Sequence, residues 1–319
     1  MANLRILLIG NVGQVGWELK RTLSTLGDVV DIDRPGIELT SADSIRKVIR
    51  QNSPQVIVNA AAYTAVDKAE DESELAMGIN ATAPAIMAEE AKVSGAAFLT
   101  YSTDYVFDGA KQGPYTEEDQ PNPLSAYGRS KLAGDEAVRD AGGSYIIFRT
   151  SWVYGARGKN FLLTMMKLVA EREVVKVVDD QIGAPTWSRS LAEATAQVIA
   201  QRANGRANHS STVAERFADV KGVYNLTSDG RTSWFGFTEA IVNEMRALGR
   251  ESLARVLPIT SAEYPVRAVR PKNSVLDNSK LKNTFGLTMP QWDDALSMVV
   301  DELQSLPSVN SSRALAGQS

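Results

Sequence analysis

The chain has 319 residues, 44% of them hydrophobic and 23% charged, a composition typical of a globular protein with a large core. The net charge is −4, from 34 basic and 38 acidic side chains without a long basic run, which argues against a nucleic-acid partner. The chain has no cysteine and one histidine, so disulfides and thiolate or histidine metal sites are not expected, and we predict no metal.

The N-terminal residues lead directly into a strand pattern. They lack the layout of a signal peptide, and no stretch reaches the ~18 apolar residues that a membrane span requires. We therefore expect a cytoplasmic protein without a membrane segment.

The first predicted elements are a strand, a glycine turn and a helix. Leu4–Ile9 is an apolar run, and Gly10, Gly13 and Gly16 follow it in the spacing G-x-x-G-x-x-G, before a helical pattern at 17–23. Such a turn lets the backbone approach a dinucleotide pyrophosphate, which then rests on the free N–H groups of the helix N-terminus. A plain strand-to-helix turn is the alternative, and three glycines in one turn argue against it.

The second strand, predicted at 28–33, ends in Asp33. This residue lies near the distance from the glycine turn at which an acidic side chain contacts the adenosine ribose of a dinucleotide. The contact favours NAD, whereas the neighbouring Arg34 is suited to pair with the 2′-phosphate of NADP. Asp31 competes for the ribose role, and the residues leave both NADH and NADPH open.

Strands and helices continue to alternate up to residue 155, which predicts a Rossmann-type, doubly wound parallel sheet. The expected elements are a helix at 41–51, a strand at 55–62, a helix at 73–94, a strand at 96–101, a helix at 125–141 and a strand at 144–149. Thr103, Asp104 and Tyr105 follow the strand at 96–101. Hydroxyls and a carboxylate at the carboxyl end of a strand are typical of an active site.

The helix at 125–141 carries Tyr127 and Lys131, one turn apart on the same face. A phenol has an unperturbed pKa of about 10, and a nearby ammonium lowers it by favouring the phenolate. We therefore expect the pair to handle a proton. The spacing alone is weak evidence, since it occurs by chance on solvated helices.

Beyond residue 155 the rhythm changes, which predicts a smaller α/β domain for the substrate. Helices are expected at 160–172, 187–202, 232–248 and 290–305, strands at 174–178 and 222–226, and an irregular polar stretch at 203–221. His209 in that stretch is predicted to be a surface residue rather than a catalyst. We predict a dinucleotide-binding domain at 1–155, a nucleotide-sugar domain mainly at 156–306 with some chain returning to the first sheet, and a disordered tail at 307–319.

Several motifs together resemble the extended short-chain dehydrogenase/reductase family. They are the glycine turn, the Asn-Ala-Ala-Ala end of the strand at 55–62, Ser102-Thr103 and the Tyr127/Lys131 pair. More specific stretches resemble the dTDP-4-dehydrorhamnose reductases within it: 101–109, 148–154, 270–274 and above all Asp-Gln-Ile-Gly-Ala-Pro-Thr at 180–186. The resemblance implies NAD(P)H-dependent reduction of the C4 ketone of dTDP-4-dehydro-L-rhamnose, a step toward lipopolysaccharide or another cell-surface polysaccharide.

The resemblance also implies roles for individual residues. The implied catalytic set is Thr103, Tyr127 and Lys131, and the implied sugar contacts are Thr103, Asp104, Tyr105 and Trp152. The implied cofactor contacts are Gly10, Gly13, Gln14, Val15, Gly16, Asp33, Glu38, Leu39, Ala62, Tyr63, Thr64, Tyr127 and Lys131.

Some members of the family dimerise through glutamates that bind a divalent cation, so a homodimer is one expectation. Glu18 matches one of these positions. Arg189 stands where another acid is expected, which argues against a metal-linked dimer.

Other functions of the same fold remain open. Dehydratases of the family carry an Asp-Glu pair after the threonine, whereas Tyr105 follows Asp104 here, and an epimerase is excluded less strongly. A non-catalytic regulatory subunit is the alternative from another class, and the complete set of Thr103, Tyr127 and Lys131 argues against it.

Overall fold

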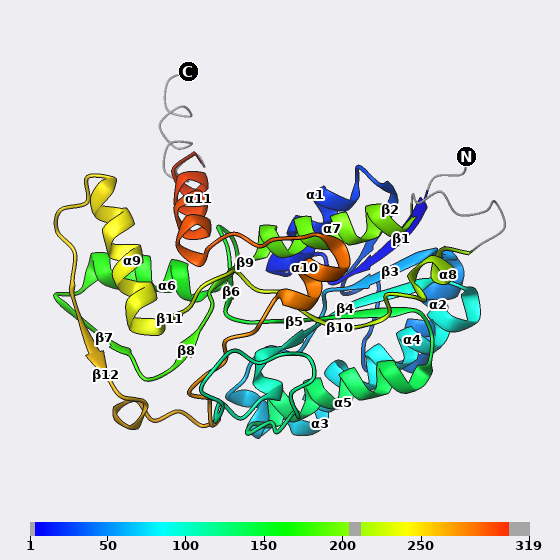
Figure 1. Cartoon of the computed structure of the whole chain (residues 1–319), viewed down its shortest axis with the longest axis horizontal. Coiled ribbons are helices and arrows are strands. Elements are labelled where there is room, and N and C mark those ends of the chain that lie inside the picture. Colours follow the sequence, from blue (N-terminus) through cyan, green and yellow to red (C-terminus); the bar gives the residue numbers. More distant parts are fainter. Residues whose placement is uncertain (1–3, 204–211, 306–319) are drawn as a thin grey trace, which may run out of the picture.

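The computed structural model describes residues 4–203 and 212–305, and its central feature is a six-stranded parallel sheet in the order β2-β1-β3-β4-β5-β10 (Figure 1). The strands are β1 (Leu4–Ile9), β2 (Gly27–Ile32), β3 (Val56–Asn59), β4 (Ala97–Thr103), β5 (Tyr145–Thr150) and β10 (Gly222–Asn225). This sheet confirms the predicted Rossmann-type fold. From β1 the chain passes first to one neighbour and then to the other, so a crevice opens at the carboxyl ends of β1 and β3.

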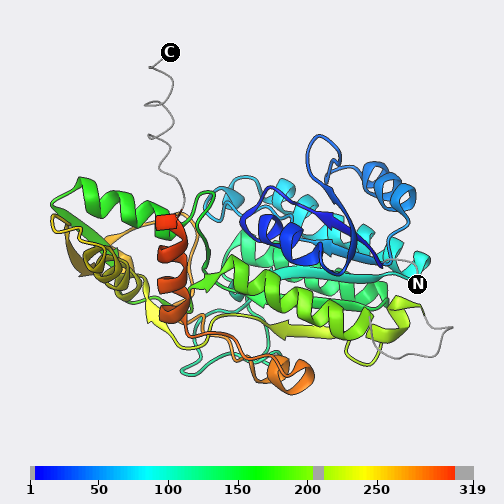
Figure 2. The same ribbon diagram turned by 90° about the horizontal axis from the view of Figure 1, so that it is seen from above.

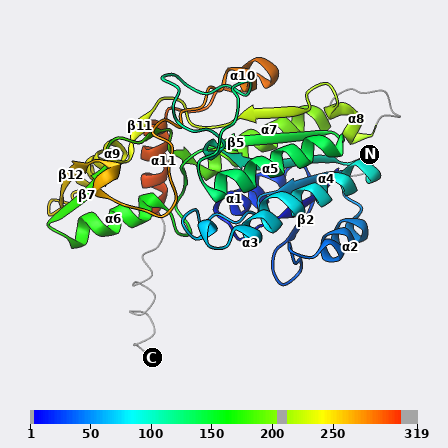
Figure 3. The ribbon, with the colours of Figure 1, turned by 90° about the horizontal axis from the view of Figure 1, so that it is seen from below.

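Helices cover both faces of this sheet. One face carries α1 (Gln14–Leu23) and α7 (Ser188–Ala203), which Figure 2 shows side by side. The other face carries α2 (Ala42–Asn52), α4 (Ala83–Ser94) and α5 (Ala126–Ala141), seen in Figure 3. Because both faces are buried, the inner strands β1, β3 and β4 are mostly buried along their length, without the alternation of apolar and polar residues that a half-exposed strand shows.

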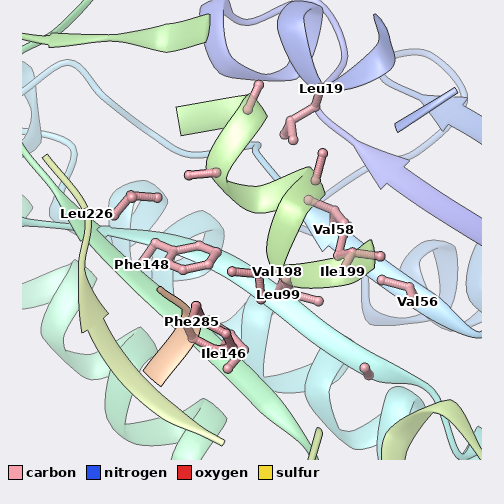
Figure 4. Packing of buried hydrophobic residues seen from close by; sticks show 14 of the residues in the cluster. Leu19, Val56, Val58, Leu99, Ile146, Phe148, Val198, Ile199, Leu226 and Phe285 are labelled. Carbon is pink, nitrogen blue, oxygen red and sulfur yellow. The ribbon is translucent and has the colours of Figure 1, made fainter. Parts of the chain in front are cut away.

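The core under α1 and α7 fixes the position of the glycine turn. Figure 4 shows Leu19 of α1 and Val198 of α7 on the side chains of the sheet, among them Val58 and Leu99. These four side chains are fully buried. Each such side chain contributes about 1.5–3 kcal/mol of apolar burial, so the start of α1 is anchored against the sheet edge where the crevice opens.

The second part of the molecule lies beyond the carboxyl ends of β4 and β5 (Figure 1). Its strands form three two-stranded sheets: β6 (Val153–Tyr154) with β9 (Thr186–Trp187), β7 (Val174–Val178) with β12 (Arg255–Ile259), and β8 (Ile182–Gly183) with β11 (Thr232–Ser233). Its helices are α6 (Phe161–Glu171), α9 (Trp234–Ala247) and α11 (Trp292–Ser305). They pack around a separate core that contains Leu162, Phe237 and Leu296.

The remaining elements are short. They are α3 (Ser73–Met77), α8 (Val213–Phe217), α10 (Ser279–Phe285), a π-helical turn at Gly78–Thr82 and 3₁₀ turns at Lys68–Glu70, Asp104–Val106 and Ser261–Glu263. The helical pattern predicted at 73–94, with interruptions at Asn80 and Pro84, is confirmed at the first of these positions, because the π turn contains Asn80. The irregular stretch predicted at 203–221 is wrong at α8, where Thr212 and Glu215 form a capping box. His209 and the predicted tail lie outside the described residues.

Some elements differ from the sequence patterns. No element was predicted at β12 or α10, and β4 continues to Thr103, two residues past its predicted end. Thr103 is thus held by the parallel ladder, opposite Thr150 of β5. Two elements after residue 155 belong to the first part of the molecule: α7 packs on the six-stranded sheet, and β10 is one of its edge strands.

The glycine turn depends on close backbone packing between its two ends. A Cβ on Gly16 would lie 1.9 Å from the Gly10 carbonyl oxygen, so only glycine lets α1 start this close to β1. We predict that Gly16→Ala lowers the free energy of unfolding by roughly 1–3 kcal/mol, the usual cost of overpacking, measured by urea denaturation. Gly78→Ala is the matched control, since a Cβ there meets nothing within 4 Å, and it should stabilise by about 0.5–1 kcal/mol. Equal stability of the two variants would contradict this packing.

Candidate active site

A cleft of about 690 Å³ opens at the carboxyl ends of β1, β3 and β4. It is lined by most of the residues predicted to contact a cofactor: Gly10, Gly13, Gln14, Val15, Asp33, Leu39, Ala62, Tyr63, Thr64, Tyr127 and Lys131. These residues come from five separate stretches of the chain. The fold therefore brings the glycine turn and the Tyr127/Lys131 pair to a single cleft.

Two predicted cofactor residues do not line this cleft. Gly16 is packed behind the turn against Gly10. The exposed Glu38 carboxylate accepts hydrogen bonds from Arg34 at 2.9 Å and from the Thr40 hydroxyl at 2.8 Å. Gly16 therefore shapes the turn without facing the cleft, and Glu38 orders the loop beside Arg34.

The start of α1 has the features of a pyrophosphate site. The N-cap residue of α1 is Gly13, which has no side chain to cap the helix. The first N–H groups of α1 are therefore left without a side-chain acceptor and can donate to a ligand. Asp33 accepts from the Val12 N–H at 3.2 Å and lines the cleft. Asp31 is held instead by Lys20 at 2.9 Å. The geometry thus favours Asp33 over Asp31 for a ribose contact, and the residues present fit a dinucleotide.

Tyr127 lies in the first turn of α5, whose N-cap Ser125 accepts from the Gly128 N–H at 3.1 Å. Burial raises the pKa of the Tyr127 phenol to about 12, and a hydrogen bond with Thr103 offsets this in part. The net pKa of Tyr127 is therefore raised, and the expectation of a lowered value is wrong because burial outweighs the opposing interactions. The Lys131 ammonium donates to the Tyr101 carbonyl oxygen at 2.7 Å.

Lys131 belongs to a buried group of charges behind the cleft. Its burial lowers the pKa of the ammonium to about 8, and the negative charge of Asp135 acts in the opposite direction. Asp135 lies one turn further along α5 and pairs with Arg149 of β5, Nε to Oδ2 at 3.3 Å. All three side chains are at most 5% exposed. Asp135 therefore helps to keep Lys131 charged near neutral pH.

Thr103, Asp104 and Tyr105 adjoin Tyr127 but do not line the dinucleotide cleft itself. The Thr103 hydroxyl donates to Asp104 Oδ1 at 2.9 Å. Burial raises the pKa of the Asp104 carboxyl to about 7, with hydrogen bonds from Ser274 and Thr103 opposing the shift. The Tyr105 ring meets the Tyr127 ring edge-on, with centroids 5.9 Å apart. A hydroxyl, a carboxyl and two phenols are thus gathered at one point.

Trp152 is held in an unusual conformation by its neighbours. Its φ of +48° lies in the left-handed region, which is uncommon for a large side chain. The indole stacks on Trp234 at the start of α9, with centroids 3.5 Å apart and planes 7° apart. A Cβ on Gly183 would lie 2.5 Å from the Trp152 ring. The Asp-Gln-Ile-Gly-Ala-Pro-Thr stretch therefore contributes the space that this indole occupies.

Arg189 lies between two acidic side chains. Its guanidinium pairs with Glu18 at 3.2 Å and with Glu302 at 2.6 Å. The Arg189 guanidinium thus neutralises Glu18, the residue that matches a metal-binding glutamate of some family members. Within residues 4–203 and 212–305, no group of three or more His, Asp or Glu side chains is placed to hold a metal ion.

Known proteins resemble this chain over nearly its whole length. The family model of the RmlD substrate binding domain matches residues 4–305. The dTDP-4-dehydrorhamnose reductase of Burkholderia thailandensis is 47% identical over 95% of this chain and 100% of its own length. The enzyme of the same name from Salmonella typhimurium is 39% identical over 94% of this chain and 98% of its own.

The chain belongs to the dTDP-4-dehydrorhamnose reductase family. Its family membership agrees with solved structures. A reductase of this family from Clostridium acetobutylicum superposes with a TM-score of 0.85 and 36% identity, covering 94% of this chain and all of the other. A Bacillus anthracis reductase, solved in complex with NADP, gives a TM-score of 0.84 and 33% identity over 95% of this chain and all of its own. A UDP-glucose 4-epimerase from Thermus thermophilus, with 17% identity and a TM-score of 0.76, shares the fold alone.

Several cleft residues of this reductase-family chain had no predicted role. They include Ile37, Tyr101, Ser102, Thr150, Val153, Gly158 and Lys159. A predicted strand that continued to Thr103 would have placed Ser102 at the carboxyl end of β4 and so indicated that it lines the cleft. No local sequence motif identifies Gly158 and Lys159 as cleft residues. They precede α6 in the chain, and only the tertiary fold brings them to the cleft.

Within residues 4–203 and 212–305, no helix combines the length and apolar character needed to cross a membrane.

The buried charges predict a measurable titration. In ¹⁵N-lysine NMR, the Lys131 ammonium should titrate near pH 8, with its signal assigned by its loss in Lys131→Met. Since Asp135 raises this pKa, Asp135→Asn should move the midpoint to lower pH and Asp135→Glu should restore it. Asp140→Asn, an exposed change on the same helix, is the control and should leave the midpoint in place. A midpoint that Asp135→Asn does not move would contradict the electrostatic role of this carboxylate.

Proposed function

We propose that the chain reduces the C4 ketone of dTDP-4-dehydro-L-rhamnose to give dTDP-L-rhamnose, with NADH or NADPH as the reductant. The observation that supports this most directly is the position of Tyr127. It lines a cleft that fits a dinucleotide and meets Thr103 and Asp104 at its border. The shared name of the relatives supports the choice of sugar.

Tyr127 is the proton donor in this proposal. When bound, the reduced nicotinamide supplies the hydride that C4 accepts. The ketone oxygen then gains negative charge, and a donor placed at that oxygen lowers the barrier most. A phenol with a pKa of about 12 stays protonated at neutral pH and releases its proton only to a stronger base. An alkoxide is such a base, so the raised pKa suits a general acid.

Lys131 acts on the state that follows proton transfer. The Tyr127 phenolate left behind is costly in a buried site, and a neighbouring ammonium stabilises it. Lys131 is fixed one turn from Tyr127 on α5 and is held by the Tyr101 carbonyl. Asp135 maintains its charge. The helix thus supplies both the acid and the cation that it needs, in a fixed arrangement.

Thr103 and Asp104 position the sugar. Thr103 hydrogen-bonds to the Tyr127 phenol and can orient the same ketone oxygen. Asp104 has a pKa of about 7, so its carboxylate form, which accepts from a sugar hydroxyl, increases as the pH rises through neutrality. Trp152 offers an aromatic face to the apolar side of the sugar ring, and its stack on Trp234 keeps that face in place.

Other predictions from the sequence stay predictions. They are the homodimer, the cytoplasmic location and the division of the chain at residue 155, while the choice between NADH and NADPH stays open.

The proposal predicts the effect of removing the Tyr127 hydroxyl. Tyr127→Phe should lower kcat by roughly 10²–10⁴-fold, the usual loss for a missing general acid. The assay follows oxidation of NADH or NADPH on addition of dTDP-4-dehydrorhamnose. Tyr145→Phe is the control, since Tyr145 is a partly buried tyrosine packed on the sheet core away from the cleft. Near-normal turnover in a folded Tyr127→Phe protein would contradict the assignment.

The same assay separates the alternative functions. A reductase oxidises the cofactor only when the ketone sugar is present, whereas an epimerase leaves bound cofactor unspent. A regulatory subunit would show neither turnover nor epimerised sugar.

A further inference from the structure

The segment at 155–160, which joins β6 to α6, closes one side of the dinucleotide cleft. We call it the 155–160 strap. Gly158 and Lys159 line the cleft together with Gly13 and Gln14 of the glycine turn. The strap follows the first five strands of the six-stranded sheet in the chain, and most of it belongs to the part of the sequence predicted to bind the sugar. Its presence in the cofactor cleft therefore needs its own explanation.

Asn160 fixes the end of the strap on the glycine turn. Its side-chain amide donates to Gln14 Oε1 at 2.9 Å and to the Gly155 carbonyl at 2.9 Å. The oxygen of the same side chain accepts from the Leu163 N–H at 3.0 Å and so caps α6. One side chain thus ties α6 to the start of α1.

Arg157 provides a second attachment to α1. Its guanidinium lies over the Trp17 ring, 4.7 Å from the centroid. Trp17 follows the glycine turn on the first turn of α1. Gly158, between the two attachments, has a φ of +77°, and a Cβ there would lie 3.3 Å from Gln14 Cγ. The strap is therefore held against α1 on both sides of Lys159.

Among the described residues, Lys159 is the cation lining the cleft beside the glycine turn whose ammonium has no partner within the protein. Within the described residues, no ion pair or hydrogen bond is formed by its ammonium, and the side chain is exposed. The other cations that line the cleft are engaged: Arg34 pairs with Glu38, and Lys131 donates to the Tyr101 carbonyl. The adjacent N-terminus of α1 offers N–H donors and partial positive charge but no full charge.

We propose that Lys159, held over the start of α1 by the 155–160 strap, is a cofactor-binding residue whose ammonium pairs with the pyrophosphate of the dinucleotide. The inference rests on the proposed function, because it requires a dinucleotide in this cleft. It places a contact to the cofactor in the half of the chain that follows residue 155. The pyrophosphate would then contact both the N-terminus of α1 and Lys159, which precedes α6, and so link the two helices.

The pyrophosphate is distinguished from the 2′-phosphate of NADP by position. Lys159 lines the cleft next to Gly158, which lies against Gln14 at the start of α1, where a dinucleotide places its pyrophosphate. A 2′-phosphate would lie beside the ribose, where Asp33 and Arg34 line the cleft. A pyrophosphate contact affects NADH and NADPH equally, whereas a 2′-phosphate contact affects NADPH alone.

The test is direct titration of the purified full chain with NADH and with NADPH, without sugar, followed by nucleotide fluorescence. Lys159→Gln should raise Kd for both nucleotides by the same factor, roughly three- to thirtyfold for a charge-assisted contact open to water. The affinity of the variant should also depend less steeply on salt. Lys159→Arg should retain most of the affinity, because it keeps the charge. Lys167→Gln, an exposed lysine on α6 paired with Glu171, is the matched control and should bind like the wild type.

The outcomes separate this inference from the proposed function. Unchanged affinity in Lys159→Gln, or a loss confined to NADPH, would overturn the inference and leave the reductase proposal intact. A wild-type protein that binds neither nucleotide would overturn both. An equal loss for NADH and NADPH, reversed by Lys159→Arg, would support the contact.

Discussion

The site depends on keeping one ammonium charged inside the protein. Lys131 is 5% exposed, and that burial lowers its pKa to about 8. A buried cation is costly unless an opposite charge accompanies it, and Asp135, itself paired with Arg149, provides that charge. Helix α5 and strand β5 must therefore pack closely, which the doubly wound sheet ensures. The remainder of the site is arranged around this fixed charge.

The proton-handling groups and the aromatic wall proposed for the sugar come from different parts of the fold. The proton donor and its cation lie on α5, beside the glycine turn of the first sheet. The aromatic wall, Trp152 stacked on Trp234, comes from the second part of the molecule, and Gly183 leaves room for it. The Asp-Gln-Ile-Gly-Ala-Pro-Thr stretch thus shapes the site through the packing of Gly183 against Trp152.

The sequence predicted the parallel sheet well because strand and helix periods alternate regularly up to residue 155. The sequence also predicted correctly that the cofactor residues share one cleft, because the glycine turn and the carboxyl ends of parallel strands lie at the same edge of the sheet. Sequence spacing failed on electrostatics: it predicted a lowered pKa for Tyr127, whereas burial raises it to about 12. It also missed Lys159, because no local pattern shows that a loop before α6 returns to α1. Desolvation and tertiary contacts are properties of the folded chain and leave no periodic signal.

The central claim is that the chain moves a hydride from a nicotinamide to C4 of a nucleotide sugar. The most direct test uses NADH or NADPH deuterated at C4 of the nicotinamide, with dTDP-4-dehydrorhamnose as substrate and mass spectrometry of the sugar product. With the deuterium on the transferred face, the account predicts dTDP-rhamnose that carries one deuterium at C4 of the sugar, with one cofactor oxidised per product. A converted sugar without deuterium, and with the cofactor still reduced, would contradict the account.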